Sequence, residues 1–457
     1  MMAAHLYSNY RKPKMRWLPA VPDHWKEQRA KTFFQEVDER SKTGQEELLS
    51  VSHLTGVTPR SQKNVTMFKA ASYVGSKLCS PGDIVVNTLW AWMAALGASR
   101  HVGIVSPAYG VYRPRRADNF NPAYLDYLLR IPAYVAEYIG RSTGIQSSRL
   151  RLYPNQFLDI VLIQPPRPEQ DQIVAYLRAK DSRIARFIKT KRDLIKLLTE
   201  QKMRIIDHAV TRGLNANVTL KPSGVEWLGE VPEHWEVSKV KLLAEYINGF
   251  PFKPAEWGEK GRPIIRIQNL TKEHAAFNYY DGVIPERNHV KDGDILLSWS
   301  ASLGVFVWNR GDAWLNQHIF KVVPDPKRIT RGYFVWLARW FLNHMEAEAH
   351  GSTMQHITKP KFGSFPVPLP SLSEQMEIEA HIDREIRDID LAISRTEDEI
   401  KLIREYRDRL ISDVVTGQVD VRAWRPGPED VVDDTALTIL GDGQEDVAEE
   451  VSENDED

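Results

Sequence analysis

Apolar residues follow two different spacings along the chain, and each spacing occurs twice. Short apolar runs after turn residues, such as "PGDIVVN" at 81–87 and "DGDILLS" at 292–298, predict strands. After Glu169, and again after Glu374, apolar residues recur at alternating intervals of four and three, which predicts a long coiled-coil helix. The pattern therefore predicts an α+β fold in which a globular unit and a long helix are followed by a second unit and a second helix.

The two long helices are expected to pair with each other. Their apolar seam positions are Leu177, Ile184, Ile188, Ile195, Leu198, Ile205 and Ala209 in the first, and Ile382, Ile386, Ile389, Ile393, Ile400, Ile403, Leu410 and Val414 in the second. Polar residues interrupt the seam at Asp181, Lys191 and Lys202, and at Thr396 and Arg407. Two interruptions coincide when the copies are shifted by 205 residues. Independent helices on separate cores would not need this match, whereas paired helices use polar seam residues to fix their register.

Residues typical of helix ends mark where each long helix begins and stops. Pro168 and Ser373 predict the starts, and Gly213 and Gly417 lie just past the predicted ends. A helix from residue 169 to 211 would be about 65 Å long at 1.5 Å per residue. Such a helix is expected to act as a spacer.

The chain also repeats itself outside the helices. "WLPAVPDHW" at 17–25 returns as "WLGEVPEHW" at 227–235 with six of nine residues identical, and "RSTGIQ" at 141–146 has a counterpart in "GSTMQ" at 351–355. Because unit and helix alternate, the second helix must run back along the first, so we expect antiparallel helices, one unit at each end and an approximate two-fold axis within the chain. The expected divisions are residues 1–166 and 214–371 for the globular units, 167–213 and 372–417 for the helices, and 418–457 for an acidic, disordered tail.

Composition limits the class of protein. With 457 residues the chain is long enough for two or three domains, and its single cysteine, Cys79, excludes an internal disulfide and a thiolate-rich zinc site. No apolar run approaches the ~20 residues that cross a bilayer, so we expect a soluble protein in a reducing cytoplasm.

The formal charge of -1 hides two parts of opposite sign. Residues 426–457 contain thirteen Asp and Glu and no Lys or Arg, which leaves residues 1–425 with a net charge of +12. A basic body suggests a polyanion such as nucleic acid as partner, although a solvated surface has the same composition.

The repeated motifs resemble those of the DNA-specificity subunit of type I restriction-modification systems. The resemblance rests on "SGVEWLGEVPEHWEV" at 223–237, on the two P-x-x-x-E-Q starts of the long helices and on the S-T-x-x-Q and S-T-x-Q loops, and it covers nearly all of residues 10–425. It implies that each globular unit is a target-recognition domain that reads one half of a bipartite double-stranded DNA site. It also implies that the helices and repeated segments bind two methyltransferase subunits, and that motor-nuclease subunits can join.

The resemblance further implies that this chain is noncatalytic. S-adenosylmethionine, and for restriction ATP and Mg²⁺, are then expected on the partner subunits, with no cofactor or metal in this chain. The acidic tail departs from the family pattern, and two roles are open for it: a disordered, solubilising end, or a segment that competes with DNA for the basic channel.

An enzyme is the competing class, but its motifs are weak. "NPAY" at 121–124 resembles the N-P-P-Y turn of amino-methyltransferases, yet Asn121 better suits the cap of a helix that begins at Pro122. No G-x-x-x-x-G-K-[ST] loop occurs, the histidines have no metal-ligand spacing, and the nuclease-like Glu399-Ile400-Lys401 lies in the helix seam. A self-contained adenine methyltransferase and a repeat scaffold without DNA specificity remain the alternatives.

Residues expected to contact DNA are found in the segments that follow or interrupt the repeat. Basic, hydroxyl and amide groups suit phosphates and base edges. The candidates are Arg141, Ser142, Thr143, Gln146, Ser147, Arg149 and Arg151 in the first unit, and Asn316, Gln317, Ser352, Thr353, Gln355, His356, Lys359 and Lys361 in the second. Thr143 and Thr353 also suit simple turn capping, and amides often satisfy only the backbone.

Two further groups have an open interpretation. Trp90 and Trp92 suit either DNA contact or the core. Cations on the first helix suit either sequence-independent DNA contact or a solvated helix face: Arg178, Lys180, Arg183, Arg186, Lys189 and Arg192.

Overall fold

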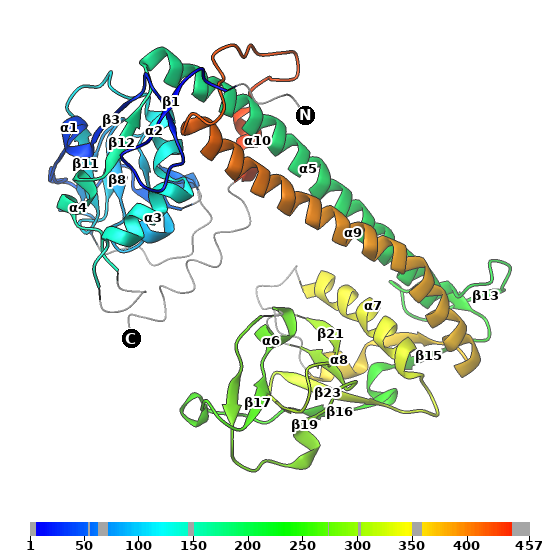
Figure 1. Cartoon of the computed structure of the whole chain (residues 1–457). Coiled ribbons are helices and arrows are strands. Elements are labelled where there is room, and N and C mark those ends of the chain that lie inside the picture. The colour runs from blue at the N-terminus through cyan, green and yellow to red at the C-terminus, as the bar shows by residue number, and fades with distance from the viewer. Residues whose placement is uncertain are drawn as a thin grey trace. The chain divides into compact units, whose positions relative to one another are not determined.

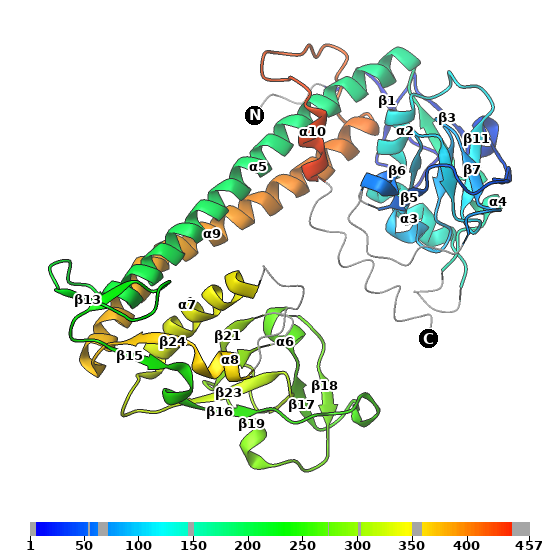
Figure 2. The same cartoon turned by 180° about the vertical axis from the view of Figure 1, so that it is seen from behind.

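The computed structural model describes residues 6–53, 55–62, 72–144, 150–272, 274–299, 303–349 and 359–440. The chain forms two compact units: unit 1 comprises Met1–Asp193 and Thr396–Asp457, and unit 2 comprises Leu194–Arg395. Each long helix contributes one part to unit 1 and one part to unit 2. Mixed strands and helices in both units confirm the α+β class (Figures 1 and 2).

The main sheet of unit 1 is antiparallel, with strand order β4-β11-β8-β9. Val111 of β11 pairs with Val85 of β8, and both side chains are fully buried, as expected for a central pair of strands. The strands of unit 1 are β1 Tyr10–Arg11, β2 Val21–Pro22, β3 Lys26–Arg29, β4 Phe34–Glu36, β5 Leu49–Ser52, β6 Gly56–Pro59, β7 Lys77–Cys79, β8 Ile84–Val86, β9 Leu96–Ala98, β10 Gly103–Val105, β11 Gly110–Pro114 and β12 Val161–Gln164. Its shorter helices are α1 Ala30–Phe33, α2 Pro122–Leu129, α3 Pro132–Arg141, α4 Pro154–Leu158 and α10 Asp434–Leu437.

The main sheet of unit 2 has the same topology, with strand order β16-β23-β20-β21. Unit 2 adds a second sheet of order β18-β17-β22-β19, in which β17 and β22 run parallel. The strands are β13 Leu220–Pro222, β14 Glu230–Pro232, β15 Glu236–Lys239, β16 Ala244–Asn248, β17 Arg262–Ile265, β18 Asn278–Tyr280, β19 His289–Val290, β20 Ile295–Ser298, β21 Gly304–Val307, β22 Ala313–Leu315, β23 Ile319–Pro324 and β24 Pro366–Leu369. The shorter helices are α6 Ile267–Thr271, α7 Arg331–Ala349 and α8 Lys359–Ser364.

Two further strand pairs recur in both units. The antiparallel pair of β1 with β2 in unit 1 matches that of β13 with β14 in unit 2, and the second recurring pair lies after the repeated motif. In unit 1 the strand after the "PDHW" segment, β3, pairs antiparallel with β12, and in unit 2 the strand after "PEHW", β15, pairs antiparallel with β24. Each of these pairs joins the start of a unit to the strand that leads into a long helix. The sequence repeat is therefore a repeat of fold, whereas the remaining sheets differ: unit 1 has the pairs β5-β6 and β10-β7, and unit 2 has the sheet β18-β17-β22-β19.

The two long helices, α5 Arg167–Arg212 and α9 Leu372–Val415, run antiparallel within each unit. In unit 1 Asp181 of α5 contacts Arg407 of α9, and Lys191, farther along α5, contacts Glu399, which lies earlier in α9. In unit 2 the same side-by-side packing joins Lys202 to Asp390, with nitrogen and oxygen 2.5 Å apart. The predicted pairing of the helices is confirmed.

Both long helices end as their sequences predicted. Gly213 has a φ of +73° and Gly417 a φ of +78°, which is the left-handed conformation that favours glycine after a helix. The chain can then turn back sharply onto the framework of the unit.

The segment after α9 is part of unit 1, where the sequence analysis expected a disordered tail from residue 418. Val421 is buried, and the Gln172 amide on α5 donates to the carbonyls of Val421 and Trp424, 3.2 and 2.7 Å away. Acidic composition predicted disorder, but apolar residues within the segment give it a packing face. Residues 441–457 lie outside the described part of the chain.

Candidate functional site

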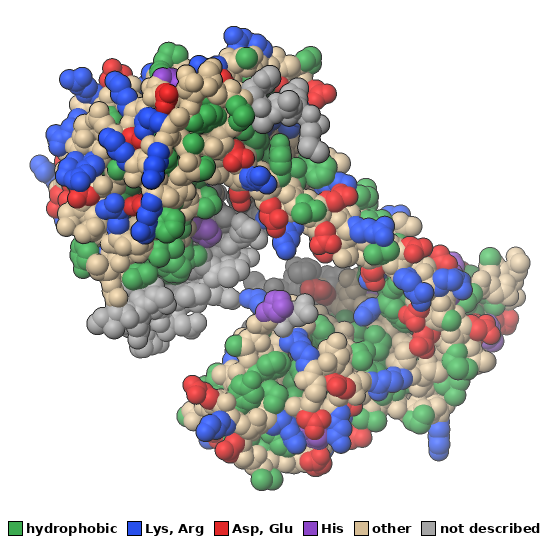
Figure 3. Space-filling model, viewed as in Figure 1, with side chains coloured by type: hydrophobic (Ala, Val, Ile, Leu, Met, Phe, Trp, Pro, Cys, Tyr) green, Lys and Arg blue, Asp and Glu red, His purple; other side chains and the backbone are tan. Residues whose placement is uncertain are grey.

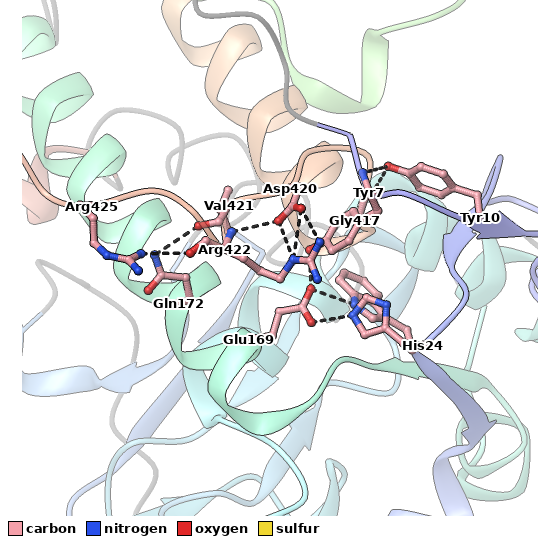
Figure 4. Close-up of polar contacts among 11 residues, drawn as sticks. Tyr7, Tyr10, His24, Glu169, Gln172, Gly417, Asp420, Val421, Arg422 and Arg425 are labelled. Atoms are coloured by element: carbon pink, nitrogen blue, oxygen red, sulfur yellow. Dashed lines mark hydrogen bonds and ion pairs between the residues drawn. The ribbon is translucent and has the colours of Figure 1, made fainter.

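The first repeated motif of unit 1 surrounds one buried carboxylate, that of Glu169 in the first turn of α5 (Figure 4). The Trp25 indole donates to Glu169 Oε1 over 3.0 Å, His24 Nε2 lies 2.9 Å from Oε2, and the Tyr7 hydroxyl also donates to Oε1. Burial, together with the bond to Glu169, raises the pKa of Tyr7 far above its ordinary value, so Tyr7 stays a donor. Glu169 thus holds the repeated His-Trp pair at the start of the long helix.

The second copy of the motif builds a looser version in unit 2. His234 Nε2 lies 3.1 Å from Glu374 Oε2, the counterpart of the His24 contact. The Trp235 ring is buried, but its indole N–H has no acceptor among the described residues. The same residues therefore stabilise both helix starts, with fewer hydrogen bonds in unit 2.

The glutamine that follows each of these glutamates has the same role in both units. Gln170 is fully buried, donates to the Pro165 and Asn119 carbonyls and accepts from the Asn121 amide at 2.7 Å. Gln375, also fully buried, donates to the Pro370 and Arg328 carbonyls and accepts from the Thr330 amide at 2.8 Å. The repeated Glu-Gln pair is thus structural, because its polar atoms are used up in joining segments of one unit.

In unit 1 the structure brings four of the predicted DNA-contacting residues together after α3. Thr143 and Arg151 pair through two backbone hydrogen bonds of 3.0 Å, so these two residues lie side by side. Arg151 and Thr143 are exposed, whereas Arg141 forms an ion pair with Glu137 and the Ser142 hydroxyl donates to a carbonyl of α3. Arg151 is therefore the member of this group most open to a partner.

In unit 2 the predicted residues Asn316 and Gln317 form the turn between β22 and β23. A chain of contacts links this turn to α8: His318 packs against Trp299, Trp299 stacks on Phe320, and Lys359 lies over the Phe320 ring. Lys361 is exposed on the same short helix. The amide turn and the α8 lysines therefore belong to one region of unit 2.

The remaining predicted contacts, Gln146, Ser147, Arg149, Ser352, Thr353, Gln355 and His356, lie outside the described residues.

The cationic face of α5 in unit 1 is occupied in part by the segment after α9. Arg183 forms an ion pair with Glu429 at 3.0 Å, and Lys180 lies 3.7 Å from Asp430. Arg186 donates to the carbonyls of Val431 and Glu429. We call residues 426–433 the strap. Between the start of α5 and the residues from Arg422 to Val432 lies a cavity of about 970 Å³ with Arg178, Arg422 and Arg425 in its lining.

Structural contacts account for the enzyme-like motifs of the sequence. The Asn121 side chain accepts from the amides of Ala123 and Tyr124 and caps α2, as predicted. Glu399 forms an ion pair with Lys191. Within the described ranges no cluster of three or more His, Cys, Asp or Glu could hold a metal ion, and no helix there is long and apolar enough to span a membrane.

Sequence reasoning missed two arginines on the second sheet of unit 2. Arg262 lies over the Trp314 ring, 4.2 Å from its centroid, and Arg266 lies over the Trp257 ring at 4.7 Å. In the segment "RPIIR" at 262–266 the two arginines are four residues apart, so in an extended strand both side chains point to the same face. This spacing could have identified them from the sequence. Trp314 is 52 residues from Arg262 and could not be deduced as its partner from the sequence, whereas Trp257 lies only nine residues before Arg266.

Comparison with known proteins identifies the fold of the chain and the family of one of its domains. Residues 232–402 match the family model of the type I restriction modification DNA specificity domain. The chain carries a type I DNA specificity domain. This match and the relatives, which align with 43% and 65% of the chain, confirm the resemblance that the repeated motifs indicated.

Those relatives are themselves type I specificity subunits. The chain is 25% identical over 197 residues to the EcoBI specificity subunit of Escherichia coli, which covers 43% of this chain and 41% of that subunit. It is 24% identical over 319 residues to the MjaVIII specificity subunit of Methanocaldococcus jannaschii, with 65% and 70% covered. The match thus spans less than half of the E. coli subunit and about two thirds of the archaeal one.

A chain from a solved type I restriction-modification system has the same fold. That structure is described in terms of complex assembly and conformational transition; its chain is 16% identical, with a TM-score of 0.59, and the match covers 87% of this chain and 99% of the other. The specificity-domain match ends within α9 and therefore includes most of unit 2 and the part of α9 that packs there.

Proposed function

We propose that this chain is the noncatalytic DNA-recognition subunit of a type I restriction-modification complex and reads an asymmetric, bipartite double-stranded DNA site. The observation that supports this most is the combination of one repeated framework with two different sets of smaller sheets. A shared framework gives both units the same way of approaching DNA, whereas different surfaces allow them to read different bases.

The long helices have features of a protein docking surface. Apolar side chains remain exposed on α5 and α9: Phe187, Leu402 and Tyr406 in unit 1, and Leu194, Leu197 and Leu391 in unit 2. Leu197 is 61% exposed and Leu402 is 63% exposed. In a soluble helix pair, large apolar side chains are normally buried, so exposed ones indicate a surface that binds another protein. Figure 3 shows apolar side chains among the charged ones on the visible face of these helices. We propose that two methyltransferase subunits cover them, one on each unit, and that motor-nuclease subunits join that assembly.

The chemistry is proposed to belong to those partners. S-adenosylmethionine would bind the methyltransferase subunits, and ATP and Mg²⁺ the motor-nuclease subunits. Each target adenine has to leave the base stack to reach a methyltransferase pocket, so the complex is expected to distort its DNA. A cytoplasmic location follows from this function.

The test is to map methylated adenines by long-read sequencing of host DNA with and without this gene. Loss of one asymmetric, gapped adenine motif would support the proposal and give both half-sites. Unchanged methylation in an active system would contradict it and favour a scaffold without DNA specificity. Binding of S-adenosylmethionine by the purified chain alone would favour the self-contained methyltransferase instead.

A second experiment tests the modular reading. Exchange of residues 26–140 for the equivalent part of a related chain leaves Trp25, Glu169 and both long helices unchanged. It should alter one half of the methylated motif and preserve the other. A change in both halves, or in neither, would contradict the assignment of one half-site to each unit.

A further inference from the structure

One face of the second sheet of unit 2 presents two arginines in a row. Alternate residues of a strand point to the same face, so Arg262 and Ile264 of β17 share a face. Arg266 follows β17 with a φ of -108° and a ψ of 164°, an extended conformation that continues this alternation. Arg262 and Arg266 therefore lie on one face, about 13 Å apart at ~3.3 Å per residue.

Tryptophan rings support both guanidinium groups. Trp314 lies opposite Ile264 in the parallel pairing of β17 with β22, which places its ring beneath Arg262. Trp257 lies beneath Arg266. A guanidinium stacked on an aromatic ring keeps its N–H donors in a plane and remains free to bind an anion at its edge. The two stacks thus preorganise the two arginines.

Neither arginine is neutralised by a carboxylate among the described residues. Arg266 donates to the amide oxygens of Asn278 and Gln268, 2.6 and 2.9 Å away, which orient it without cancelling its charge. The Arg262 side chain has no hydrogen bond within the described part of the chain, and both arginine side chains are partly exposed. Such oriented and uncompensated positive charges favour an anionic ligand.

A third stacked arginine in unit 2 shows what a structural role looks like. Arg310 lies over the rings of Trp308 and Phe277, but it also donates to the main-chain carbonyl of Asn269. Its donors are used to fix the end of α6. The Arg262 side chain makes no hydrogen bond of this kind to the described residues, so a role in stabilising the fold does not account for its position.

The two arginines adjoin residues that the sequence had already suggested for DNA contact. The amide of Asn316 donates to the carbonyl of Ile265, 3.3 Å away, so the turn of Asn316 and Gln317 lies at the same end of the sheet as Arg266. We propose that Arg262 and Arg266 bind phosphates of the DNA backbone and so set the register in which this turn meets the bases. This inference rests on the proposed DNA-binding function.

Binding of the full-length chain to a fluorescent mixed-sequence duplex, measured by anisotropy over a series of salt concentrations, tests the proposal. Arg262→Gln and Arg266→Gln should each weaken binding about 10-fold and reduce the slope of log K against log salt by about 1. Arg262→Lys keeps the charge but loses the stacked fork, so it should preserve the slope and weaken binding less. Arg331→Gln removes an exposed charge from the start of α7 and is the matched control, with little expected change.

The outcomes separate this inference from the function on which it rests. If the wild-type chain binds and Arg262→Gln behaves like Arg331→Gln, the phosphate assignment is overturned and the proposed function stands. If Arg262→Gln weakens binding only to duplexes that contain the recognised motif, the residue reads bases and the phosphate assignment is also overturned. A wild-type chain that binds no duplex would contradict the proposed function itself. Arg262→Gln removes the stacking on Trp314 but no side-chain hydrogen bond to the described residues, so its unfolding temperature should be within a few degrees of the wild type.

Discussion

The indole of Trp25 donates to the carboxylate of Glu169 over 3.0 Å and so fastens the first repeated motif to the first turn of α5. We expect Glu169→Ala to destabilise the chain by about 3 kcal/mol, because it leaves three buried or half-buried donors without their acceptor. Glu374→Ala should cost only about 1 kcal/mol, since Glu374 is more exposed and binds only His234 among the described repeat residues. Differential scanning calorimetry of both variants checks the difference, and equal losses would contradict it.

The seam of the helix pair in unit 1 contains a buried ion pair. Loss of one partner should destabilise the fold strongly, whereas replacement of the whole pair by apolar residues should change the stability little. Arg407 binds both oxygens of Asp181, at 2.7 and 3.2 Å, and the Tyr127 hydroxyl donates to the same carboxylate. Burial alone would lower the pKa of Arg407, but the charge and hydrogen bonds of Asp181 outweigh it and raise that pKa. Arg407→Met should therefore cost about 3–5 kcal/mol by leaving Asp181 without its counter-charge.

The control for this ion pair is its complete apolar replacement. The triple variant Asp181→Leu, Arg407→Met and Tyr127→Phe removes all three hydrogen-bonded groups. It leaves Asp408, which lies 3.7 Å from Arg407 but is 72% exposed and can be solvated by water. The triple variant should therefore be close to the wild type in stability or above it. Thermal unfolding measures both variants. A triple variant as unstable as Arg407→Met would show that the ion pair contributes more than its desolvation costs.

The two glycines after the long helices should differ in their tolerance of a side chain. A Cβ on Gly417 would lie 2.5 Å from the ring of Pro22 and 3.0 Å from that of Trp25, whereas a Cβ on Gly213 would lie 3.1 Å from Trp235. Gly213→Ala should cost about 1 kcal/mol, chiefly for its positive φ, and Gly417→Ala about 3 kcal/mol because the rigid proline cannot yield. Chemical denaturation of the two variants compares these costs; a smaller loss for Gly417→Ala would be contrary to the structure.

The single cysteine, Cys79, should make the unfolding free energy fall as the pH rises above neutral. Burial raises the pKa of the Cys79 thiol to about 11, whereas an unfolded thiol ionises near ~8.5. The folded state thus favours the protonated thiol, and its stabilising contribution is complete below about pH 8.5 and is lost as the pH rises toward 11. Over this interval the unfolding free energy of the wild type should fall by up to about 3 kcal/mol more than that of Cys79→Ala. Parallel pH profiles of the two proteins would contradict this expectation.

The strap should weaken sequence-independent DNA binding, because it neutralises cations of α5. The double variant Glu429→Gln/Asp430→Asn removes the partners of Arg183 and Lys180, so it should bind a mixed-sequence duplex about 5- to 10-fold more tightly, with a steeper salt dependence. Glu397→Gln/Asp398→Asn changes the net charge equally at exposed positions of α9 and serves as the control. Equal gains for the two variants would mean that only net charge matters.

Local patterns in the sequence predicted the helices well, and contacts between distant segments were harder to foresee. The cap at Asn121 and the glycines after both long helices were found because each depends on a few neighbouring residues. Asp181 and Arg407 were both recognised as interruptions of the seam. Which polar residues contact each other depends on the register of the two helices, and the sequence repeat does not give that register. The repeat shows only that Asp181 and Ile386 are equivalent positions, whereas the contact of Asp181 in the structure is with Arg407.

The candidate site was foreseen less completely than the helices. Asn316 and Gln317 stood out by residue type, whereas Arg262 did not, because its tryptophan partner reaches it only through the parallel pairing of β17 with β22. The residues after 418 were judged by their acidic composition, although Val421 packs into the core of unit 1. Composition describes the average of a segment, and a few apolar residues decide whether it packs.

The division of the chain into units also orders its synthesis. In the sequence, unit 2 is one continuous segment that lies between the two segments of unit 1. All of unit 2 is therefore translated before the second segment of unit 1. The Tyr10 hydroxyl donates to the carbonyl of Gly417, 407 residues later, and at ~5–20 residues per second that partner appears at least about 20 s after Tyr10. During this time unit 1 lacks Ile411, Val414 and Val415, the residues of α9 that pack into its core. The nascent chain therefore completes unit 2 before it can complete unit 1.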